Sequence, residues 1–280
     1  MQLAFSTLGT PDWSFEKTVT CATALGYDAI EIRGIEGEMD LTQIAAFQPK
    51  VIEKSIEHMT NMGVKVCCLG SSCHFHDPDE QQRRKQIEDA KAAILLAREL
   101  WCPFVRVFGD KLPDPAQKRT TIGFIVEALK EVGDYAAEHQ IKVVMETHGD
   151  FCSSSDVQDV MERVSHRNVG VLWDSHHPYR VHGESPRRTV SRLSEWIWHT
   201  HIKDSKPTDK GFEYVLTGEG DVPIPDILTQ LNRIRYDGYL SLEWEKAWHP
   251  EIEQPEIAIP DYITKMKAYL TQMEENAEYQ

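Results

Sequence analysis

The chain has 280 residues, of which 41% are hydrophobic and 27% charged, as in an ordinary globular protein. Its formal net charge of −15 disfavours nucleic acid as a partner, because an acidic surface repels a polyanion. The six cysteines form no CxxC pair, no apolar run reaches the ~18 residues of a membrane span, and the first residues lack the basic region of a signal peptide. We therefore expect a cytoplasmic protein with reduced thiols and no membrane contact.

Short apolar segments alternate with helical segments along the whole chain. In chain order, strands are predicted at residues 3–6, 29–33, 64–69, 104–108, 142–147, 169–174, 197–202 and 239–244. Helices are predicted at residues 14–25, 49–62, 79–100, 116–139, 153–164, 186–195, 224–234 and 261–274. Residues 205–222 are expected to form a polar loop.

This alternation amounts to eight β-then-α units in a single domain of residues 1–280. Near-continuous apolar strands between helices are typical of a parallel sheet covered by helices. Eight units of about 35 residues favour closure into a (β/α)₈ barrel, the TIM barrel of the α/β class. A doubly wound open sheet is the alternative, but no GxGxxG turn follows the first strand.

Four neighbouring strands end on residues that can bind a metal. In such a barrel the active-site residues lie at the C-terminal ends of the strands, and the last four strands end at Glu146, Asp174, His201 and Glu243. Each residue alone would equally suit a helix cap, a surface charge or a core histidine. Together, three carboxylates and one imidazole suit one divalent ion, with Mn²⁺ expected first and Mg²⁺, Co²⁺ or Zn²⁺ as alternatives. Without a metal, converging unpaired carboxylates would be costly.

The strings around these strand ends also resemble those of a known family. METHGDF, LWDSHHP, HTHIKD and LSLEWE are similar to segments of the xylose isomerase-like TIM barrels, also called the sugar phosphate isomerase/epimerase superfamily. The resemblance covers nearly the whole chain, from YDAIEIRG through GEGDVPIPDIL to the last strand. Its members include ketose 3-epimerases, hydroxypyruvate isomerases, inosose dehydratase, 3-dehydroshikimate dehydratases, an endonuclease and subunits that cleave C-glycosides.

The resemblance implies a role for each matching residue. The metal ligands would be the four strand-end residues named above, and the two glutamates would also serve as catalytic acid and base on opposite faces of a bound ketose. His177, three residues after the aspartate, would contact the substrate near the metal, and Lys203 would hold a substrate oxygen. The resemblance also makes dimers or tetramers the expected assemblies, although the sequence marks no interface.

The chemistry that fits these roles starts with removal of a proton from the carbon next to a carbonyl held by the metal, which acts as a Lewis acid and stabilises an enediolate. Return of the proton to the other carbon gives isomerisation, and return to the other face gives epimerisation. Loss of a β-hydroxyl instead gives dehydration. The sequence does not choose among these outcomes.

Several residues depart from the family patterns. Ketose 3-epimerases carry a glutamate where this chain has Cys152 and an arginine where it has Pro207, which argues against a free-ketose 3-epimerase. The net charge of −15 argues against the endonuclease branch. The segment Gly218-Glu219-Gly220 could cradle a phosphate, but its acidic residues would repel one, so a non-phosphorylated substrate is favoured.

Other candidate substrate contacts lie near the same rim. His74 follows the third predicted strand, and His148 lies two residues after Glu146, so that a continuing strand would give both the same orientation. Arg106 sits inside the fourth strand as a second candidate contact. The alternative for it is a structural ion pair, in which Glu31 is the partner of Arg106 or of Arg33.

The leading hypothesis is a metal-dependent sugar isomerase or epimerase of carbohydrate metabolism that acts on a small-molecule sugar or keto sugar. The first alternative is a lyase on the same barrel, such as a 3-dehydroshikimate-type dehydratase or a subunit that eliminates a glycosyl group from a 3-keto sugar. The second is a catalytically silent sugar-binding barrel. Exchange of the α-proton with solvent separates both enzymes from the binding protein.

Overall fold

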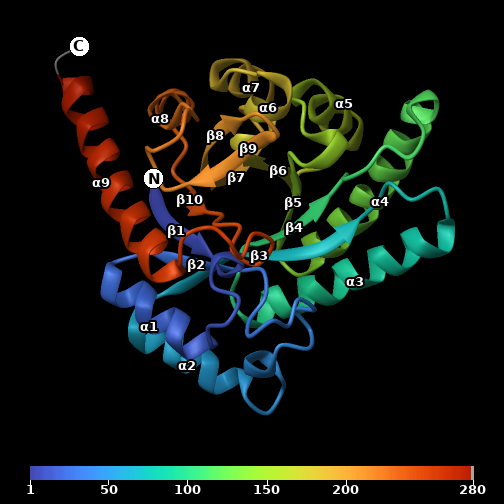
Figure 1. The fold of residues 1–280 in the computed structure, drawn as a ribbon. Coiled ribbons are helices and arrows are strands. Elements are labelled where there is room, and N and C mark those ends of the chain that lie inside the picture. Colours follow the sequence, from blue (N-terminus) through green and yellow to red (C-terminus); the bar gives the residue numbers. More distant parts are fainter. Residues whose placement is uncertain (279–280) are drawn as a thin grey trace.

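The computed structural model describes residues 1–278, so the end of the predicted domain at 279–280 lies outside the described residues. Eight parallel strands form a closed barrel in the order β1-β10-β7-β6-β5-β4-β3-β2 (Figure 1). Closure joins β1 to β10, where Gln2 pairs with Tyr239 and Phe5 with Leu242. The predicted (β/α)₈ barrel is confirmed, and the open-sheet alternative is wrong.

The barrel strands are β1 Gln2–Ser6, β2 Ala29–Ile32, β3 Lys65–His74, β4 Phe104–Phe108, β5 Lys142–Glu146, β6 Val169–Asp174, β7 Ile197–Ile202 and β10 Tyr239–Leu242. The helices are α1 Phe15–Leu25, α2 Ile52–Met62, α3 Glu80–Glu99, α4 Lys118–Glu138, α5 Ser154–Val164, α6 His176–His182, α7 Pro186–Leu193, α8 Ile224–Arg233 and α9 Pro255–Glu278. Among the described residues no helix is both long and apolar enough to cross a bilayer.

Local chemistry explains the helix ends that the sequence predicts. Ser14 caps α1 by accepting a hydrogen bond from the Lys17 backbone N–H at 3.1 Å, and Ser153 caps α5 in the same way. Gly63 closes α2 with φ of 70°, in the left-handed region where glycine carries no steric cost.

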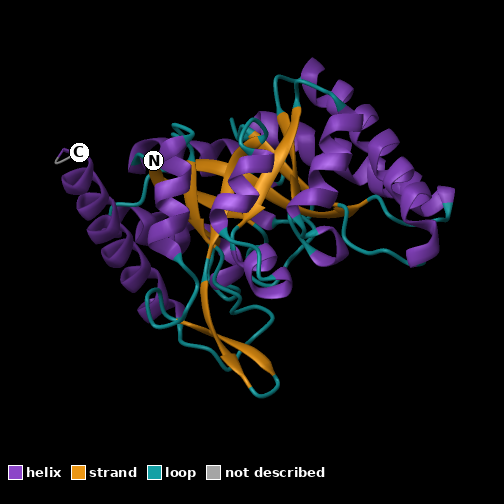
Figure 2. Ribbon diagram, turned by 90° about the horizontal axis from the view of Figure 1, so that it is seen from above, coloured by secondary structure: helices purple, strands orange, loops and turns teal. Residues whose placement is uncertain are grey.

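Three elements differ from the prediction. Residues 204–215 form a hairpin of β8 Asp204–Thr208 and β9 Gly211–Val215 where a polar loop is predicted, and Figure 2 shows this hairpin projecting beyond the barrel. The short helix α6 follows β6 directly, without an apolar periodicity that would reveal it. Helix α9 starts at Pro255 rather than at 261, because proline is tolerated in a first helical turn.

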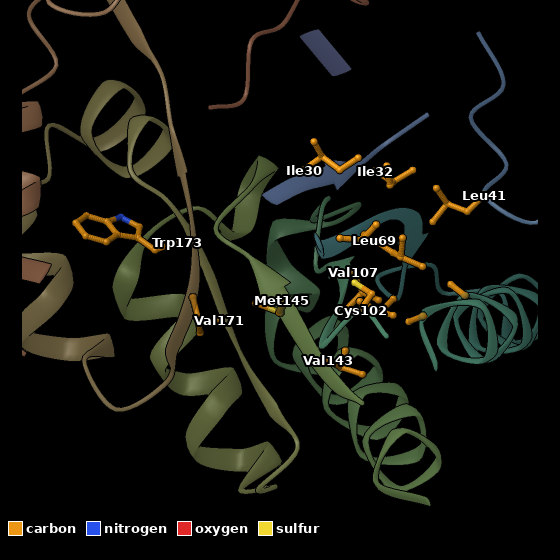
Figure 3. Packing of buried hydrophobic residues seen from close by; sticks show 14 of the residues in the cluster. Ile30, Ile32, Leu41, Leu69, Cys102, Val107, Val143, Met145, Val171 and Trp173 are labelled. Atoms are coloured by element: carbon orange, nitrogen blue, oxygen red, sulfur yellow. The ribbon is translucent and has the colours of Figure 1, made fainter. Parts of the chain in front are cut away.

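Alternate strand residues form two separate apolar clusters, because successive side chains of a strand point to opposite faces. Outward residues such as Ile30, Val107, Met145 and Trp173 belong to the large core between strands and helices (Figure 3). A second, smaller apolar cluster fills the inside of the barrel: Ala4, Ala29, Cys67, Cys68, Val144 and Leu172. This apolar floor ends where the inner face of the strands becomes charged.

The inner face changes character toward the C-terminal strand ends. Two residues beyond the floor positions Ala29, Val144 and Leu172, the same face carries Glu31, Glu146 and Asp174. All three carboxylates are buried. Apolar side chains therefore fill the lower half of the barrel interior, and the charged side chains lie in the upper half.

Candidate active site

The four predicted metal ligands come together at the C-terminal end of the barrel. Glu146 ends β5, Asp174 ends β6 and His201 lies near the end of β7. Glu243 follows β10, and its backbone N–H still donates to the carbonyl of Ile202 at 3.2 Å. One ligand atom from each of the four lies within 4.8 Å of the others, and all four residues are buried.

His201 stands between the two glutamates. Its Nδ1 lies 3.4 Å from Glu146 Oε1 and 3.2 Å from Glu243 Oε1, and it has no hydrogen-bond partner. Burial alone would lower the pKa of His201, but Glu243, Glu31 and Glu146 raise it well above its usual value. The surrounding carboxylates therefore favour a positive charge at this position, and a metal ion bound at Nδ1 would supply it in place of the proton.

Glu31 holds the other edge of this imidazole. Its Oε1 lies 2.9 Å from His201 Nε2, and its Oε2 lies 2.7 Å from His199 Nε2. Ser241 Oγ donates a third, weaker hydrogen bond to the same carboxylate at 3.3 Å. The predicted ion pair of Glu31 with an arginine is wrong, because closure of the barrel brings β7 rather than β4 to this carboxylate.

Each catalytic glutamate candidate has a cation on its second oxygen. Arg106 Nη1 lies 2.6 Å from Glu146 Oε2, and Lys203 Nζ contacts Glu243 Oε2. Burial raises the pKa of Glu146, but Arg106 and His201 together lower it to about 2. Burial likewise opposes the charge of Glu243, while His201 and Lys203 hold its pKa well below the usual value. Both glutamates are therefore carboxylates at neutral pH.

Lys203 is fully buried and contacts three carboxylates. Besides Glu243, its Nζ lies 2.7 Å from Asp174 Oδ2 and 2.6 Å from Glu245 Oε1. Burial lowers the pKa of Lys203, but Asp174, Glu243 and Glu245 raise it well above the usual value. Its ammonium is thus directed at the acidic cluster.

Asp174 has one oxygen that makes no hydrogen bond. Its Oδ1 accepts the backbone N–H of His176 at 2.8 Å and of His177 at 3.2 Å, which starts helix α6. Its Oδ2 is buried and has no hydrogen-bond partner, although Lys203 Nζ lies 2.7 Å from it as an ion pair. Two orphaned polar atoms, this oxygen and His201 Nδ1, are what a divalent ion would satisfy, so the four residues fit one.

The predicted histidines line the rim beside this centre. His177 Nδ1 lies 3.5 Å from Asp174 Oδ2, and the rings of His177 and His148 are 5.0 Å apart. His148 Nδ1 pairs with Asp110 at 3.2 Å. His74 lies at the end of β3, stacked on His76 at 4.8 Å and with Nδ1 3.1 Å from the carbonyl of Ser72. The structure therefore brings His177 and His148 together and leaves His74 on the far side of β4.

Three residues near the site were not predicted. Glu245 and His199 share strand parity with Glu243 and His201, two residues away, so the period of two could have revealed them. Tyr214 arrives from the hairpin, with its hydroxyl 3.5 Å from Glu245 Oε1. Because the hairpin itself is absent from the prediction, no sequence signal marked that contact.

This chain is similar to known proteins in both sequence and fold. A family model described as xylose isomerase-like TIM barrel matches residues 19–265. Fructoselysine 3-epimerase of Shigella flexneri is 22% identical over 282 residues, which cover 98% of this chain and 100% of the relative.

Solved structures agree in fold. A D-tagatose 3-epimerase-like protein superposes with a TM-score of 0.80 at 21% identity, covering 99% of this chain and 100% of the other. The IOLI protein, solved with a zinc atom, superposes with a TM-score of 0.78 at 19% identity, covering 97% of each chain. Both barrels are complete counterparts of this one, and the family model spans most of its length. The chain therefore belongs to the xylose isomerase-like TIM barrel family.

Proposed function

We propose that this protein is a divalent-metal-dependent isomerase or epimerase of polyhydroxylated carbonyl compounds, which works by proton abstraction next to the carbonyl. One observation carries the proposal. Glu146 and Glu243 face each other across the unpartnered Nδ1 of His201, and each has its other oxygen held by its own cation. Two buried carboxylates with one free oxygen each are suited to take and return a proton on two sides of one substrate.

Glu146, Asp174, His201 and Glu243 would hold the metal, and we propose Mn²⁺ as the native ion. The zinc atom in the IOLI protein supports a divalent ion at a barrel of this kind. When bound, the ion would supply Lewis-acid stabilisation of the enediolate.

The other residues position and stabilise. We propose that Arg106 and Lys203 keep the two glutamates ionised and oriented, which their contacts with one oxygen of each glutamate and the lowered pKa values of both carboxylates support. We propose His177 and His148 as substrate contacts because their rings lie beside Asp174 at the rim. The prediction that His74, Lys203 and Arg106 touch substrate stays a prediction, and Lys203 has the least freedom to do so.

Exchange of substrate protons with D₂O tests the proposal. The metal-loaded protein is incubated with a panel of ketoses and keto acids, and deuterium incorporation at the carbon next to the carbonyl is followed by NMR. Exchange with an isomerised or epimerised product supports the proposal, and exchange accompanied by loss of water moves the lyase ahead. A protein that binds these compounds without exchanging their protons is a binding protein, and the proposal fails.

A further inference from the structure

Arg33 is a buried guanidinium without a carboxylate partner. It follows β2 on the inner face of the barrel and is 9% exposed. Its Nη2 donates to Ser72 Oγ at 2.9 Å, and its Nη1 meets only the sulfur of Met39 at 3.8 Å. Among residues 1–275, whose side chains the structure describes, no acidic side chain lies at ion-pair distance from it. A buried charge without a counter-charge in contact is costly, and an anionic partner from outside the chain would offset that cost.

A second guanidinium lies beside it. Gly70 of β3 separates the two, because a Cβ on Gly70 would lie 2.8 Å from Arg106 Nη2 and 3.2 Å from Arg33 Cδ. Because Gly70 has no side chain, both arginines can pack against its backbone. Burial and the charge of Arg106 lower the pKa of Arg33 to about 10, as expected for two like charges in contact range.

Arg106 keeps unused donors on this side. Its Nη1 is paired with Glu146, whereas its Nε and Nη2 are buried and have no hydrogen-bond partner. Arg106 itself is 2% exposed, so water does not readily satisfy these groups. Of the five donors of a guanidinium, those on Nε and Nη2 remain for a ligand.

The charges around the site are segregated. Lys203 contacts the carboxylates of β6 and of the segment after β10, and Arg106 takes the single carboxylate of β5. Arg33 takes none. Aromatic rings flank the two arginines, with Trp248 6.0 Å from Arg33 Cζ and Phe108 4.0 Å from Arg106 Cζ. Two guanidinium groups flanked by aromatic rings thus lie on the β2–β4 side of the site.

We infer that Arg33 and Arg106 form a subsite for a carboxylate of the substrate. This inference rests on the proposed function and narrows its substrate class to polyhydroxylated carbonyl compounds that carry a carboxylate. Planar guanidinium groups match the two oxygens of a carboxylate. The bond between Arg106 and Glu146 links the subsite directly to one of the two proton-transferring glutamates.

A phosphate fits this chain less well. The backbone N–H groups of Gly218 and Gly220, the segment considered for phosphate binding, both donate to Asp204 Oδ2, at 2.8 Å and 3.1 Å. They are therefore not free for a ligand. A phosphate dianion beside Glu146 would also face stronger repulsion than a carboxylate monoanion would.

Binding of paired probes tests the subsite. Quinate and myo-inositol are cyclic polyols with and without a carboxylate, and gluconate and glucitol are the open-chain pair. We expect the metal-loaded wild type to bind each acid about tenfold more tightly than its neutral partner in isothermal titration, as for a charge-assisted hydrogen bond. Arg33→Gln should remove this preference, with affinity for the neutral polyols changed less than about twofold. Arg33→Lys should keep only part of the preference for the acids, because a lysine ammonium cannot form the two parallel hydrogen bonds that a guanidinium forms with a carboxylate.

Arg98→Gln removes the same charge from the last turn of α3 and serves as the matched control. Equal affinity for acid and neutral probes in the wild type, no binding of the acids at millimolar concentration, or equal weakening of both by Arg33→Gln would overturn the subsite. Metal binding and deuterium exchange without a carboxylate preference would overturn the subsite alone. A carboxylate preference in a protein that exchanges no protons would instead defeat the proposed function.

Discussion

Glu31 and His201 are joined across the inside of the barrel, with Glu31 Oε1 2.9 Å from His201 Nε2 although 170 residues separate them in the chain. The contact fixes which nitrogen of the imidazole carries the proton. With Nε2–H donated to the carboxylate, Nδ1 is the ring nitrogen that faces the two glutamates and the one that a metal ion would bind. Carboxylate–histidine pairs of this kind orient metal ligands and raise their basicity.

Glu31→Gln should therefore weaken metal binding by about 10- to 100-fold, because the neutral amide has one acceptor oxygen for two imidazoles and raises the basicity of His201 less than a carboxylate does. Competition with a chromophoric chelator measures the dissociation constant, and the absorption spectrum of the Co²⁺ form reports the ligand geometry. Glu16→Gln, an exposed change in the first turn of α1, is the control. Unaltered metal affinity and an unaltered Co²⁺ spectrum would show that Glu31 serves the fold only.

The purified protein should contain about one divalent ion per chain, held by the four ligand residues. Chelator treatment should lower the melting temperature, and adding back Mn²⁺ should restore it, because a ligand that binds only the native state stabilises it. Elemental analysis and a thermal melt with Mn²⁺, Mg²⁺, Co²⁺ and Zn²⁺ provide the measurement. If no metal is found and no ion shifts the melt, the binding-protein alternative moves ahead.

Glu146→Gln and Glu243→Gln should each reduce proton exchange by at least about 10²-fold, the usual contribution of a general acid or base. Both changes also remove a ligand charge, so metal content must be measured for each variant at saturating metal. The informative comparison is exchange per bound metal. A variant that fills with metal and still exchanges protons at nearly the wild-type rate contradicts the acid–base assignment.

The metal-free protein should lose stability in acid. The pKa values of Glu31, Glu146 and Glu243 are all lowered in the folded state, that of Glu146 to about 2. Groups with lowered values stabilise the fold above their unfolded pKa of about 4.3, and this stabilisation disappears as the pH falls from there toward about 2. Urea unfolding at a series of pH values measures the slope. A free energy of unfolding that stays level between pH 5 and pH 3, two values chosen on either side of about 4.3, would contradict this account.

The strand-end residues could be predicted because they depend on two local rules. The period of two determines which side chains face inward, and the parallel barrel places all strand ends at one rim, so Glu146, Asp174 and His201 could be grouped from sequence alone. The hydrogen-bond partners of these residues could not be predicted from the sequence. Glu31 reaches His199 and His201 over 168 and 170 residues, a contact that depends on the diameter of the closed barrel.

The hairpin and helix α6 were missed for a related reason. Helix α6 has seven residues, too few for an apolar period, and it starts because Asp174 accepts two backbone N–H groups. The hairpin is organised by Asp204, whose carboxylate accepts N–H groups from Ser205, Gly218, Gly220 and Val222. Both elements depend on carboxylate side chains that accept hydrogen bonds from backbone N–H groups. The pattern of apolar residues in the sequence does not reveal such contacts.

The anchoring of that hairpin separates two tasks within one continuous stretch of chain. A single residue, Lys203, lies between β7, which carries His201, and β8. Asp204 and the pairing of Arg180 with Asp221 and Ser205 immobilise the base of the hairpin, while its turn at residues 208–211 touches none of them. A change in the length or composition of this turn would therefore alter the mouth of the barrel without displacing His201 and Lys203 beneath it.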